Sequence, residues 1–284
     1  MNAPLEKTPR SPGRILVTGA TGKVGRHLVQ QLVAAGHRVR ALSRNPARAN
    51  LPPEVEVLQG DLADVASLAR AFEGVSAVHL ITLGGDNGEA LMNGDDIIQL
   101  AEKSGVRRAT VLGGWDETSV ESALQKSAIG WTRLEPVEFM SNALEWAPGI
   151  KETGAVRQLA TWPSAVVHEA DIAAVALVAL TQDGHAGKRY PLSGPQALTP
   201  AERTALIAKA VGRAITFESL DEAQERERLR ANGYPEDYVE FGIQLATNPP
   251  AQAATLVPTV EQVTGLPGRT FAAWAVENAQ AFRA

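Results

Sequence analysis

The chain has 284 residues, a net charge of −5 at pH 7 and no cysteine. The acidic balance argues against a nucleic-acid partner, because a surface that binds the phosphate backbone needs clustered Lys and Arg. The missing cysteines exclude disulfides, thiolate metal ligands and a cysteine nucleophile. The longest apolar run, 172–180, has nine residues and is too short to cross a bilayer.

Residues 1–13 contain three prolines and mixed charges, without the apolar core of a secretory signal. We expect them to form a mobile tail on a cytoplasmic protein. A chain of this length can bury a full α/β core and carry a smaller appendage.

The apolar run 15–17 predicts a strand, and Gly19, Gly22 and Gly25 follow it directly. A helix is expected to begin near Gly22, and the strand 39–42 completes a strand–helix–strand unit. Here the backbone N–H groups and the positive end of the helix dipole can meet a pyrophosphate. The segment predicts a dinucleotide site, the alternative being a tight turn that binds nothing. The expected contacts are Gly19, Ala20, Thr21, Gly22, Lys23 and Val24.

The second strand ends in Ser43 and Arg44, without the Asp or Glu that would hold the ribose of NAD. An Arg at this position accommodates the 2′-phosphate of NADP. The sequence therefore predicts that NADPH is preferred over NADH, and Lys23 can add to that preference. The alternative is that Arg44 and Lys23 are solvated loop charges.

The alternation of strands and helices continues. Further strands are expected at 55–58, 77–81, 109–112 and 129–134, and helices at 64–72, 88–103 and 171–180. Short apolar strands separated by helices predict an α/β fold, a Rossmann doubly wound parallel sheet covered on both faces. Ligands bind such sheets beyond the carboxyl ends of the strands.

From residue 191 onward the alternation fails. Helices are expected at 200–211, 220–231 and 235–246, with a strand at 215–218. We expect an NADP-binding domain over 14–150, joined by 160–190, and a smaller, mostly helical substrate-binding cap over 191–284. The hairpin 220–247 is its expected lid, with the mixed charges of 221–228 on a solvated face.

His168 and Asp171 are two polar residues close to the start of the expected helix 171–180. Asp171 is expected to cap this helix by accepting N–H bonds of its first turn. We interpret both residues as packing and capping residues rather than catalytic ones.

The motifs at 17–25, 60–62, 131–136, 139–142, 168–173 and 263–271 together resemble the NmrA-like group of atypical short-chain dehydrogenase/reductases. The resemblance runs from about Arg14 to Trp274 and implies further cofactor contacts. They are Asp61 and Leu62 beside the adenine, Ile81, Thr82 and Leu83 along the riboses, Gly113, and Pro136 beside the nicotinamide. The chain departs from the family at Glu135, where Arg is usual, and at Gly113–Gly114, where many members have Ser-Ser.

Many short-chain reductases protonate the carbonyl oxygen with a Tyr whose phenol pKa is lowered by a Lys four residues later. Here the tyrosines are Tyr190, Tyr234 and Tyr238, all outside the segment where that motif belongs. Ser122 and Lys126 have the spacing, but a serine hydroxyl is too weak an acid, and we interpret them as surface helix residues.

Three hypotheses follow from the missing dyad. In the favoured one, the protein is an NADPH-dependent reductase whose substrate supplies or tolerates its own proton transfer, as a quinone or a phenol-bearing aromatic ketone does. In the second, it binds NADP without chemistry and reports the redox state to a partner. In the third, Asp116 or His79, expected near strand ends facing the cleft, is the acid or base of a reductase or isomerase.

The expected substrate contacts are Gly114, Trp115, Phe139 and Met140, whose character suits a bulky aromatic ketone, although Phe139 can also be a core residue. Within the family, the chain resembles ketoreductases of aromatic polyketide (angucyclinone) antibiotic biosynthesis. The expected oligomeric state is a monomer or homodimer, without a metal.

Overall fold

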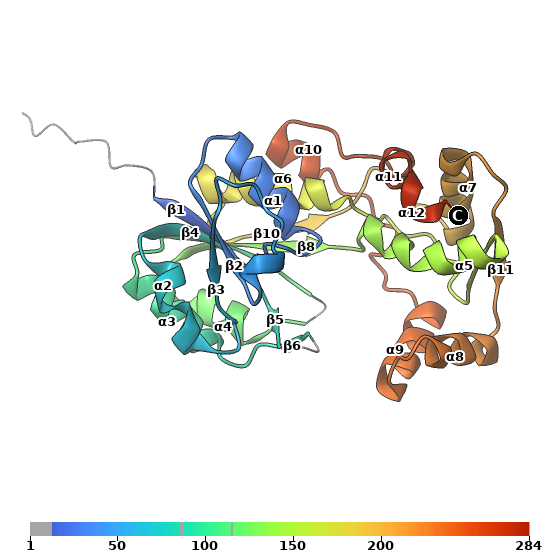
Figure 1. Cartoon of the computed structure of the whole chain (residues 1–284), viewed down its shortest axis with the longest axis horizontal. Coiled ribbons are helices and arrows are strands. Elements are labelled where there is room, and N and C mark those ends of the chain that lie inside the picture. The colour runs from blue at the N-terminus through green and yellow to red at the C-terminus, as the bar shows by residue number, and fades with distance from the viewer. Residues whose placement is uncertain (1–12, 86–87, 115, 284) are drawn as a thin grey trace, which may run out of the picture. The chain divides into compact units, whose positions relative to one another are not determined.

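The computed structural model describes residues 13–85, 88–114 and 116–283, so most of the expected tail lies outside the described residues. The chain divides into two compact units (Figure 1). Unit 1 is Met1–Glu135 with Ala173–Tyr190, and unit 2 is Pro136–Ile172 with Pro191–Ala284. The expected boundaries at 150 and 160 differ from these, because the apolar residues of 136–172 pack into the core of unit 2.

A seven-stranded sheet forms the centre of unit 1, in the order β10-β8-β7-β4-β1-β2-β3. Its strands are β1 (Arg14–Val17), β2 (Val39–Ser43), β3 (Glu56–Gln59), β4 (Val75–Ile81), β7 (Arg108–Leu112), β8 (Gly130–Pro136) and β10 (Lys188–Leu192). β1 pairs in parallel with both β2 and β4, and the pairs β2–β3, β4–β7 and β7–β8 are parallel as well. The chain thus winds away from β1 in both directions, which confirms the doubly wound α/β sheet.

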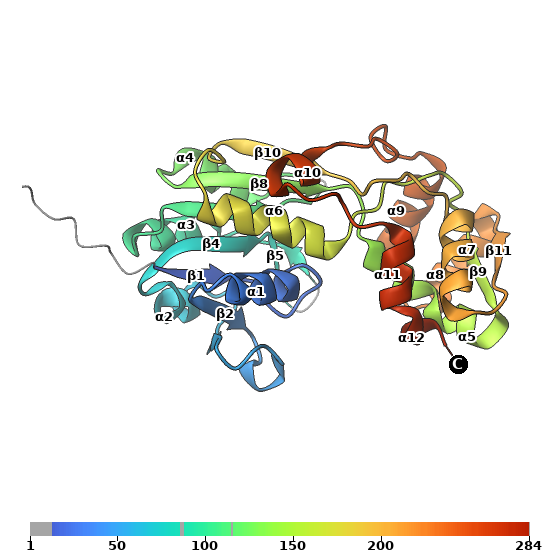
Figure 2. The same ribbon diagram turned by 90° about the horizontal axis from the view of Figure 1, so that it is seen from above.

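Helices cover both faces of this sheet. They are α1 (Gly25–Ala34), α2 (Ala69–Phe72), α3 (Gly94–Lys103), α4 (Ser119–Lys126) and α6 (Glu169–Thr181), with 3-10 turns η1 (Pro46–Arg48) and η2 (Val65–Leu68). α1 and α6 lie on one face, and α2, α3 and α4 lie on the other (Figures 1 and 2). Buried residues such as Leu16, Val78 and Val111 fill the space between the second helix layer and the sheet.

Two helices of unit 1 begin later than the sequence predicts. α1 begins at Gly25, because the Gly22 N–H donates to the Gly19 carbonyl and forms a turn first. α3 begins at Gly94 rather than at 88, and the residues before it form β6 (Glu89–Ala90), antiparallel to β5 (Leu83–Gly84). A Cβ on Gly94 would lie 2.3 Å from the carbonyl of Ser119, so glycine permits the close approach of α3 and α4.

Unit 2 is mostly helical. Its elements are η3 (Met140–Trp146), α5 (Ala147–Thr153), β9 (Ala155–Gln158), α7 (Pro200–Val211), β11 (Thr216–Ser219), α8 (Glu222–Ala231), α9 (Glu236–Thr247), α10 (Thr259–Thr264), α11 (Phe271–Glu277) and α12 (Ala279–Phe282). β9 pairs in parallel with β11, and the core gathers Met140, Ile150, Ile207 and Trp274. The helices expected at 200–211, 220–231 and 235–246 are confirmed.

The α8–α9 hairpin is held by polar contacts as well as by packing. Arg226 of α8 donates to Glu240 of α9 at 2.9 Å, and Arg230 pairs with Glu236. The mixed charges expected on a solvated face therefore lie on α8 and partly link it to α9.

The start of α6 differs from the expected cap. His168 Nδ1 accepts the N–H of Ala170 at 3.0 Å, so His168 is the residue that caps the first turn. Asp171 lies inside the helix, and its carboxylate accepts the Arg269 N–H at 2.7 Å and pairs with the Arg269 guanidinium. The prediction that Asp171 caps the helix is wrong, because its side chain is used by the segment before α11.

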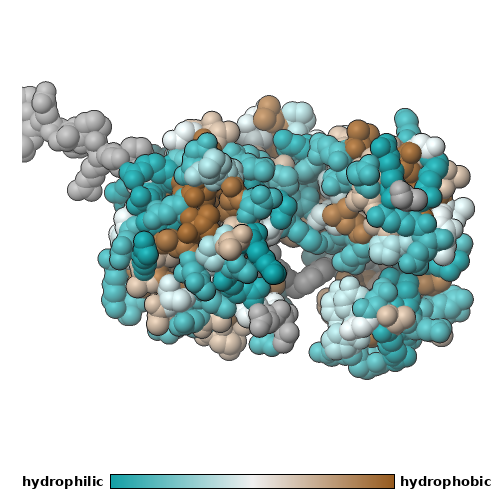
Figure 3. All heavy atoms as spheres, in the orientation of Figure 1, coloured by the Kyte–Doolittle hydropathy of each residue, from teal (hydrophilic) through white to brown (hydrophobic). Residues whose placement is uncertain are grey.

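The surface drawn in Figure 3 is largely hydrophilic, with apolar side chains confined to patches. Among the described residues, none of the helices has the length and apolar character needed to span a membrane.

Candidate cofactor site

The glycine turn after β1 has the geometry of a pyrophosphate cradle. Gly19 has φ +59°, a conformation that L residues other than glycine rarely adopt, and a Cβ there would lie 2.8 Å from Ile81. A Cβ on Gly25 would lie 2.1 Å from the Gly19 carbonyl oxygen, so this glycine lets α1 pack against the turn. Gly22 is exposed and leaves the backbone open to a ligand. The three glycines thus have the distinct roles that a dinucleotide turn requires.

Two of the expected contact residues are core residues. Ala20 and Val24 are buried at 0% and 3% exposure, so any contact they make with a cofactor is through the backbone. Thr21 and Lys23 are more accessible. Arg26, which the sequence analysis does not single out, donates to the carbonyls of Thr21 and Gly22. Arg26 stabilises the turn through these hydrogen bonds. This role follows from the direction of its side chain on α1, which the sequence pattern does not show.

Arg44 lies directly after β2, as predicted. Its side chain is exposed, and the guanidinium donates to the Gly85 carbonyl at 2.6 Å. Ser43 accepts the N–H of Asn45 through its hydroxyl. The turn after β2 and the end of the β5 strand are therefore linked through Arg44, at the carboxyl side of the sheet where NADP is expected.

The expected adenine and ribose contacts follow β3 and β4. Asp61 accepts the N–H of Ala63, and Leu62 is buried in the core, so its backbone is what it offers to a ligand. Ile81 packs against Gly19, Thr82 is buried at 3% exposure, and Leu83 is half exposed on β5. Asp61 and Leu62 follow the edge strand β3, whereas Ile81 ends β4, and β1 and β2 lie between these two strands in the sheet.

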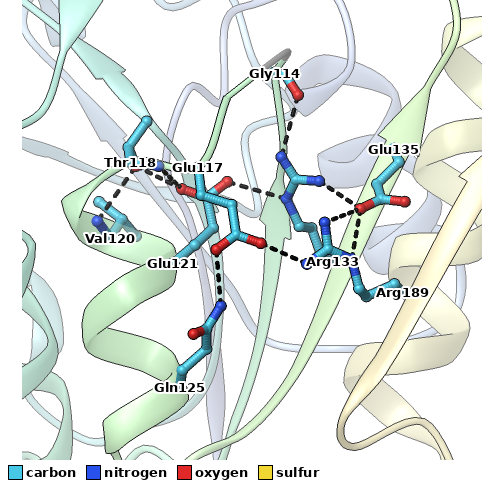
Figure 4. A network of polar contacts seen from close by, with 9 residues as sticks. All are labelled: Gly114, Glu117, Thr118, Val120, Glu121, Gln125, Arg133, Glu135 and Arg189. Atoms are coloured by element: carbon cyan, nitrogen blue, oxygen red, sulfur yellow. Dashed lines mark hydrogen bonds and ion pairs between the residues drawn. The ribbon is translucent and has the colours of Figure 1, made fainter.

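Gly113 and Gly114 follow β7, and Pro136 is the last residue of β8. The Gly113 N–H donates to the Leu134 carbonyl at 2.9 Å. The Gly114 carbonyl accepts from Arg133, a buried residue that the sequence analysis leaves aside (Figure 4). An arginine between Trp131 and Leu134, in the middle of a predicted strand, is the signal that points to it.

Of the expected substrate contacts, Gly114 belongs to unit 1, and Phe139 and Met140 belong to unit 2. Phe139 is partly buried and forms a bridge with Val167, while Met140 is 1% exposed and belongs to the core of unit 2. Gly114 is exposed at the end of β7. Trp115 lies outside the described residues.

His79 does not face a cleft, so that expectation is wrong. It is fully buried within β4, where its Nδ1 lies 2.8 Å from the Thr110 hydroxyl. Burial lowers the pKa of His79 to about 4, because a charged imidazole is poorly solvated there. The ring is neutral at physiological pH and has no access to a ligand. Asp116 is exposed beyond β7 and is the accessible member of the pair.

The tyrosines and the Ser122–Lys126 pair give no phenol dyad. Tyr190 lies on β10 with its hydroxyl 2.8 Å from His185, and Tyr234 and Tyr238 stack on each other at 4.4 Å in unit 2. Ser122 and Lys126 lie on α4, whose buried face consists of other residues. Neither Tyr190 nor the Ser122–Lys126 pair thus forms the Tyr–Lys dyad of other short-chain reductases.

The glycine turn leaves space where a pyrophosphate approaches, so the chain fits a bound dinucleotide. The parallel sheet and this turn define an NAD(P)H-binding Rossmann protein, and a family model described as NAD(P)H-binding matches residues 19–116. The chain belongs to the NmrA-like group of atypical short-chain dehydrogenase/reductases. It is an NAD(P)H-dependent oxidoreductase, with NADP(H) as its cofactor.

Relatives are similar along their whole length. The (4-alkanoyl-5-oxo-2,5-dihydrofuran-3-yl)methyl phosphate reductase of Streptomyces griseus is 40% identical over 284 residues, covering 94% of this chain and 99% of the relative. The NADPH complex of an Escherichia coli NADPH-dependent quinone oxidoreductase has a TM-score of 0.79 and 26% identity, covering 93% of this chain and 99% of that one. Nmra, a negative transcriptional regulator in complex with NAD, shares the fold at a TM-score of 0.70 and 18% identity, with 93% and 94% coverage.

Proposed function

We propose that the protein reduces bulky, conjugated carbonyl compounds with NADPH, and that the substrate rather than a side chain supplies the proton. The polycyclic hydroxy-ketones of aromatic polyketide antibiotic biosynthesis fit this description. The observation that carries the proposal is the burial of His79, together with a sequence in which no tyrosine is followed by a lysine four residues later.

NADPH, when bound, supplies a hydride to the carbonyl carbon and leaves as NADP⁺, while the carbonyl oxygen needs one proton. The glycine turn holds the pyrophosphate through backbone N–H groups, and Arg26 keeps that turn in place. Arg44 provides the positive charge for the 2′-phosphate. The chain thus binds and orients the reactants, and orientation alone lowers a barrier substantially.

The proton source follows from the acids that the chain offers. His79 is neutral and enclosed, and Asp116 is exposed beyond β7. A hydroxyl ortho or peri to a ketone donates its proton within the substrate. Such a substrate needs no protein acid in the transition state.

The relatives support a conjugated acceptor. The Streptomyces griseus substrate carries, by its name, an alkanoyl ketone and a ring carbonyl, and the Escherichia coli protein is a quinone oxidoreductase. In such acceptors a hydride that adds at a conjugated position, rather than at the carbonyl carbon, leaves a negative charge that spreads over several atoms. A protein without a strong acid is suited to that chemistry.

Quinones are the second candidate, and the likeness to the NADPH-dependent quinone oxidoreductase favours them. Hydride and one proton convert a quinone into a hydroquinone. A non-catalytic redox sensor is the third candidate, since Nmra shares the fold.

The test measures NADPH oxidation and product mass with polycyclic hydroxy-ketones, their methyl ethers, simple quinones and unactivated ketones. We expect turnover of the hydroxy-ketone and a loss of about a hundredfold or more with its methyl ether, because the proton source is blocked. Equal turnover of both compounds would contradict substrate-supplied protonation. Turnover confined to quinones would favour the second candidate, and tight NADPH binding without any turnover would favour the sensor.

A further inference from the structure

A buried ion pair lies beside the carboxyl end of β7. The side chains of Arg133 on β8 and Glu121 on α4 are 6% and 2% exposed, and Arg133 Nε donates to Glu121 at 3.2 Å. The same guanidinium pairs with Glu135 and donates to the Gly114 carbonyl at 3.1 Å (Figure 4). One side chain thus joins a strand, a helix and the backbone that follows β7.

Glu121 extends this contact to the start of α4. Its second carboxylate oxygen accepts the backbone N–H of Thr118 at 2.8 Å and the Thr118 hydroxyl. Arg133 therefore contacts Gly114 directly and Thr118 through Glu121.

Arg189 of β10 closes the network from the other side. It donates to Glu135 at 2.8 Å and to Glu117. The hydrogen bond from Arg189, followed by that from Gln125, lowers the pKa of Glu117 from its ordinary value. The Arg189 guanidinium therefore stabilises the anionic form of Glu117.

Gly113 is matched to this arrangement. A Cβ at Gly113 would lie 2.6 Å from Arg133 Cζ and Nε and 2.8 Å from its Nη2. By contrast, a Cβ at Gly114 would meet nothing within 4 Å. The first glycine makes room for the guanidinium, so a side chain at position 113 would collide with Arg133, whereas position 114 has no such constraint.

We propose that Arg133 is a positioning residue that fixes the backbone after β7, acting on Gly114 directly and on Thr118 through Glu121, where the hydride acceptor binds. The inference rests on the proposed function for the role of that backbone in turnover. The placement of the backbone itself is independent of any substrate.

Arg133→Lys is the main variant. A lysine keeps the charge but presents a single head group, which cannot reach Glu121, Glu135 and Gly114 together. The second variant is the neutral swap Arg133→Met with Glu121→Gln, which avoids leaving a buried carboxylate without its cation. The control is Arg108→Lys. Arg108 lies on β7 of the same sheet and forms a surface ion pair with Asp183, whose side chain is 94% exposed.

Two measurements read the position of the backbone without a substrate. Hydrogen exchange at the amides of Gly113 and Thr118, which donate to the Leu134 carbonyl and to Glu121, should be faster in Arg133→Lys and in the neutral swap, and unchanged in the control. Gly113→Ala should lower the melting temperature of the wild type more than that of the neutral swap, where the guanidinium is gone, because contacting residues are energetically coupled. Unchanged exchange, or a Gly113→Ala effect that is equal in both backgrounds, would overturn the positioning role.

Turnover is the third readout. We expect Arg133→Lys to lower kcat by on the order of tenfold or more, since small misplacements near the reacting atoms are costly, with the Kd for NADPH changed by less than about twofold. A parallel loss of NADPH binding would mean a structural role only. If the wild type reduces no acceptor, the proposed function fails, and the exchange and melting data still decide the positioning role.

Discussion

The glycines at 22 and 25 should separate cofactor affinity from stability when each is replaced by alanine. Neither has the left-handed backbone conformation that excludes side chains, so a methyl group is limited only by what it meets. At Gly25 it meets the Gly19 carbonyl oxygen at 2.1 Å, together with other backbone atoms. At the exposed Gly22 it lies 3.1 Å from the same oxygen.

The magnitudes follow from these distances. Restoring a contact of 3.0 Å at Gly25 requires α1 or the turn to move by about 1 Å. Overpacking of this kind costs about 1–3 kcal/mol, which corresponds to a fall in melting temperature of roughly 2–10 °C. Gly22→Ala should leave the melting temperature nearly unchanged but obstruct the pyrophosphate. The lost charged hydrogen bond weakens NADPH binding by about tenfold or more.

Thermal unfolding without ligand and calorimetric titration with NADPH measure the two effects separately. Gly114→Ala is the matched control for stability, because its added methyl group meets nothing within 4 Å. If Gly25→Ala melts at the wild-type temperature, the close approach of α1 to the turn is not a constraint. If Gly22→Ala binds NADPH as tightly as the wild type, the pyrophosphate does not lie on this turn.

Three further outcomes are expected. The wild type should prefer NADPH over NADH by about tenfold to a hundredfold, because a hydrogen bond to a charged group contributes about 1.5–3 kcal/mol. Arg44→Asp should reverse this preference. An unchanged ratio of the two Kd values would refute the assignment of Arg44 to the 2′-phosphate. His79 stays neutral in the native state down to pH about 4, whereas the unfolded chain protonates it near pH 6.5. As the pH falls from 6.5 to about 4, the free energy of unfolding should therefore decrease by about 3 kcal/mol. Denaturant titrations of His79→Asn should lack this share of the acid loss, and an identical pH slope would contradict the shifted pKa. Asp116→Ala should lower kcat by less than about tenfold, and a loss of more than about a hundredfold would identify Asp116 as the acid.

Six of the seven strands of the unit 1 sheet are predictable from the sequence, because they contain short apolar runs between helical segments. β10 has the sequence KRYPL, which is no apolar run, and it is not predicted. The glycine turn and the position of Arg44 follow from the same pattern, since the carboxyl ends of parallel strands share one edge. Of the helices in the C-terminal part, α7, α8 and α9 are expected from the sequence, whereas the short helices α10, α11 and α12 are not.

Other features depend on contacts between distant segments. Residues 136–172 belong to unit 2 because Met140 and Ile150 pack with Trp274, which lies far along the chain. Asp171 has the sequence position of a cap, but Arg269 takes its carboxylate. The local sequence pattern does not show such distant partners.

The buried side chains of the site show the same limit. His79 and Arg133 are both polar residues in the middle of strands. The sequence alone does not distinguish a fully buried imidazole from a guanidinium that positions a backbone segment. Burial and hydrogen-bond partners make that distinction.

The discontinuous division of the chain has a consequence during synthesis. Met140 and Ile150 leave the ribosome well before Phe271 and Trp274 of α11, with which they share a core. At roughly 5–20 residues per second, a gap of more than about 100 residues takes roughly 5–25 s. Through that interval the apolar side chains of 136–172 lack their native cover, so the newly made chain presents a substrate for chaperones before it is ever an enzyme.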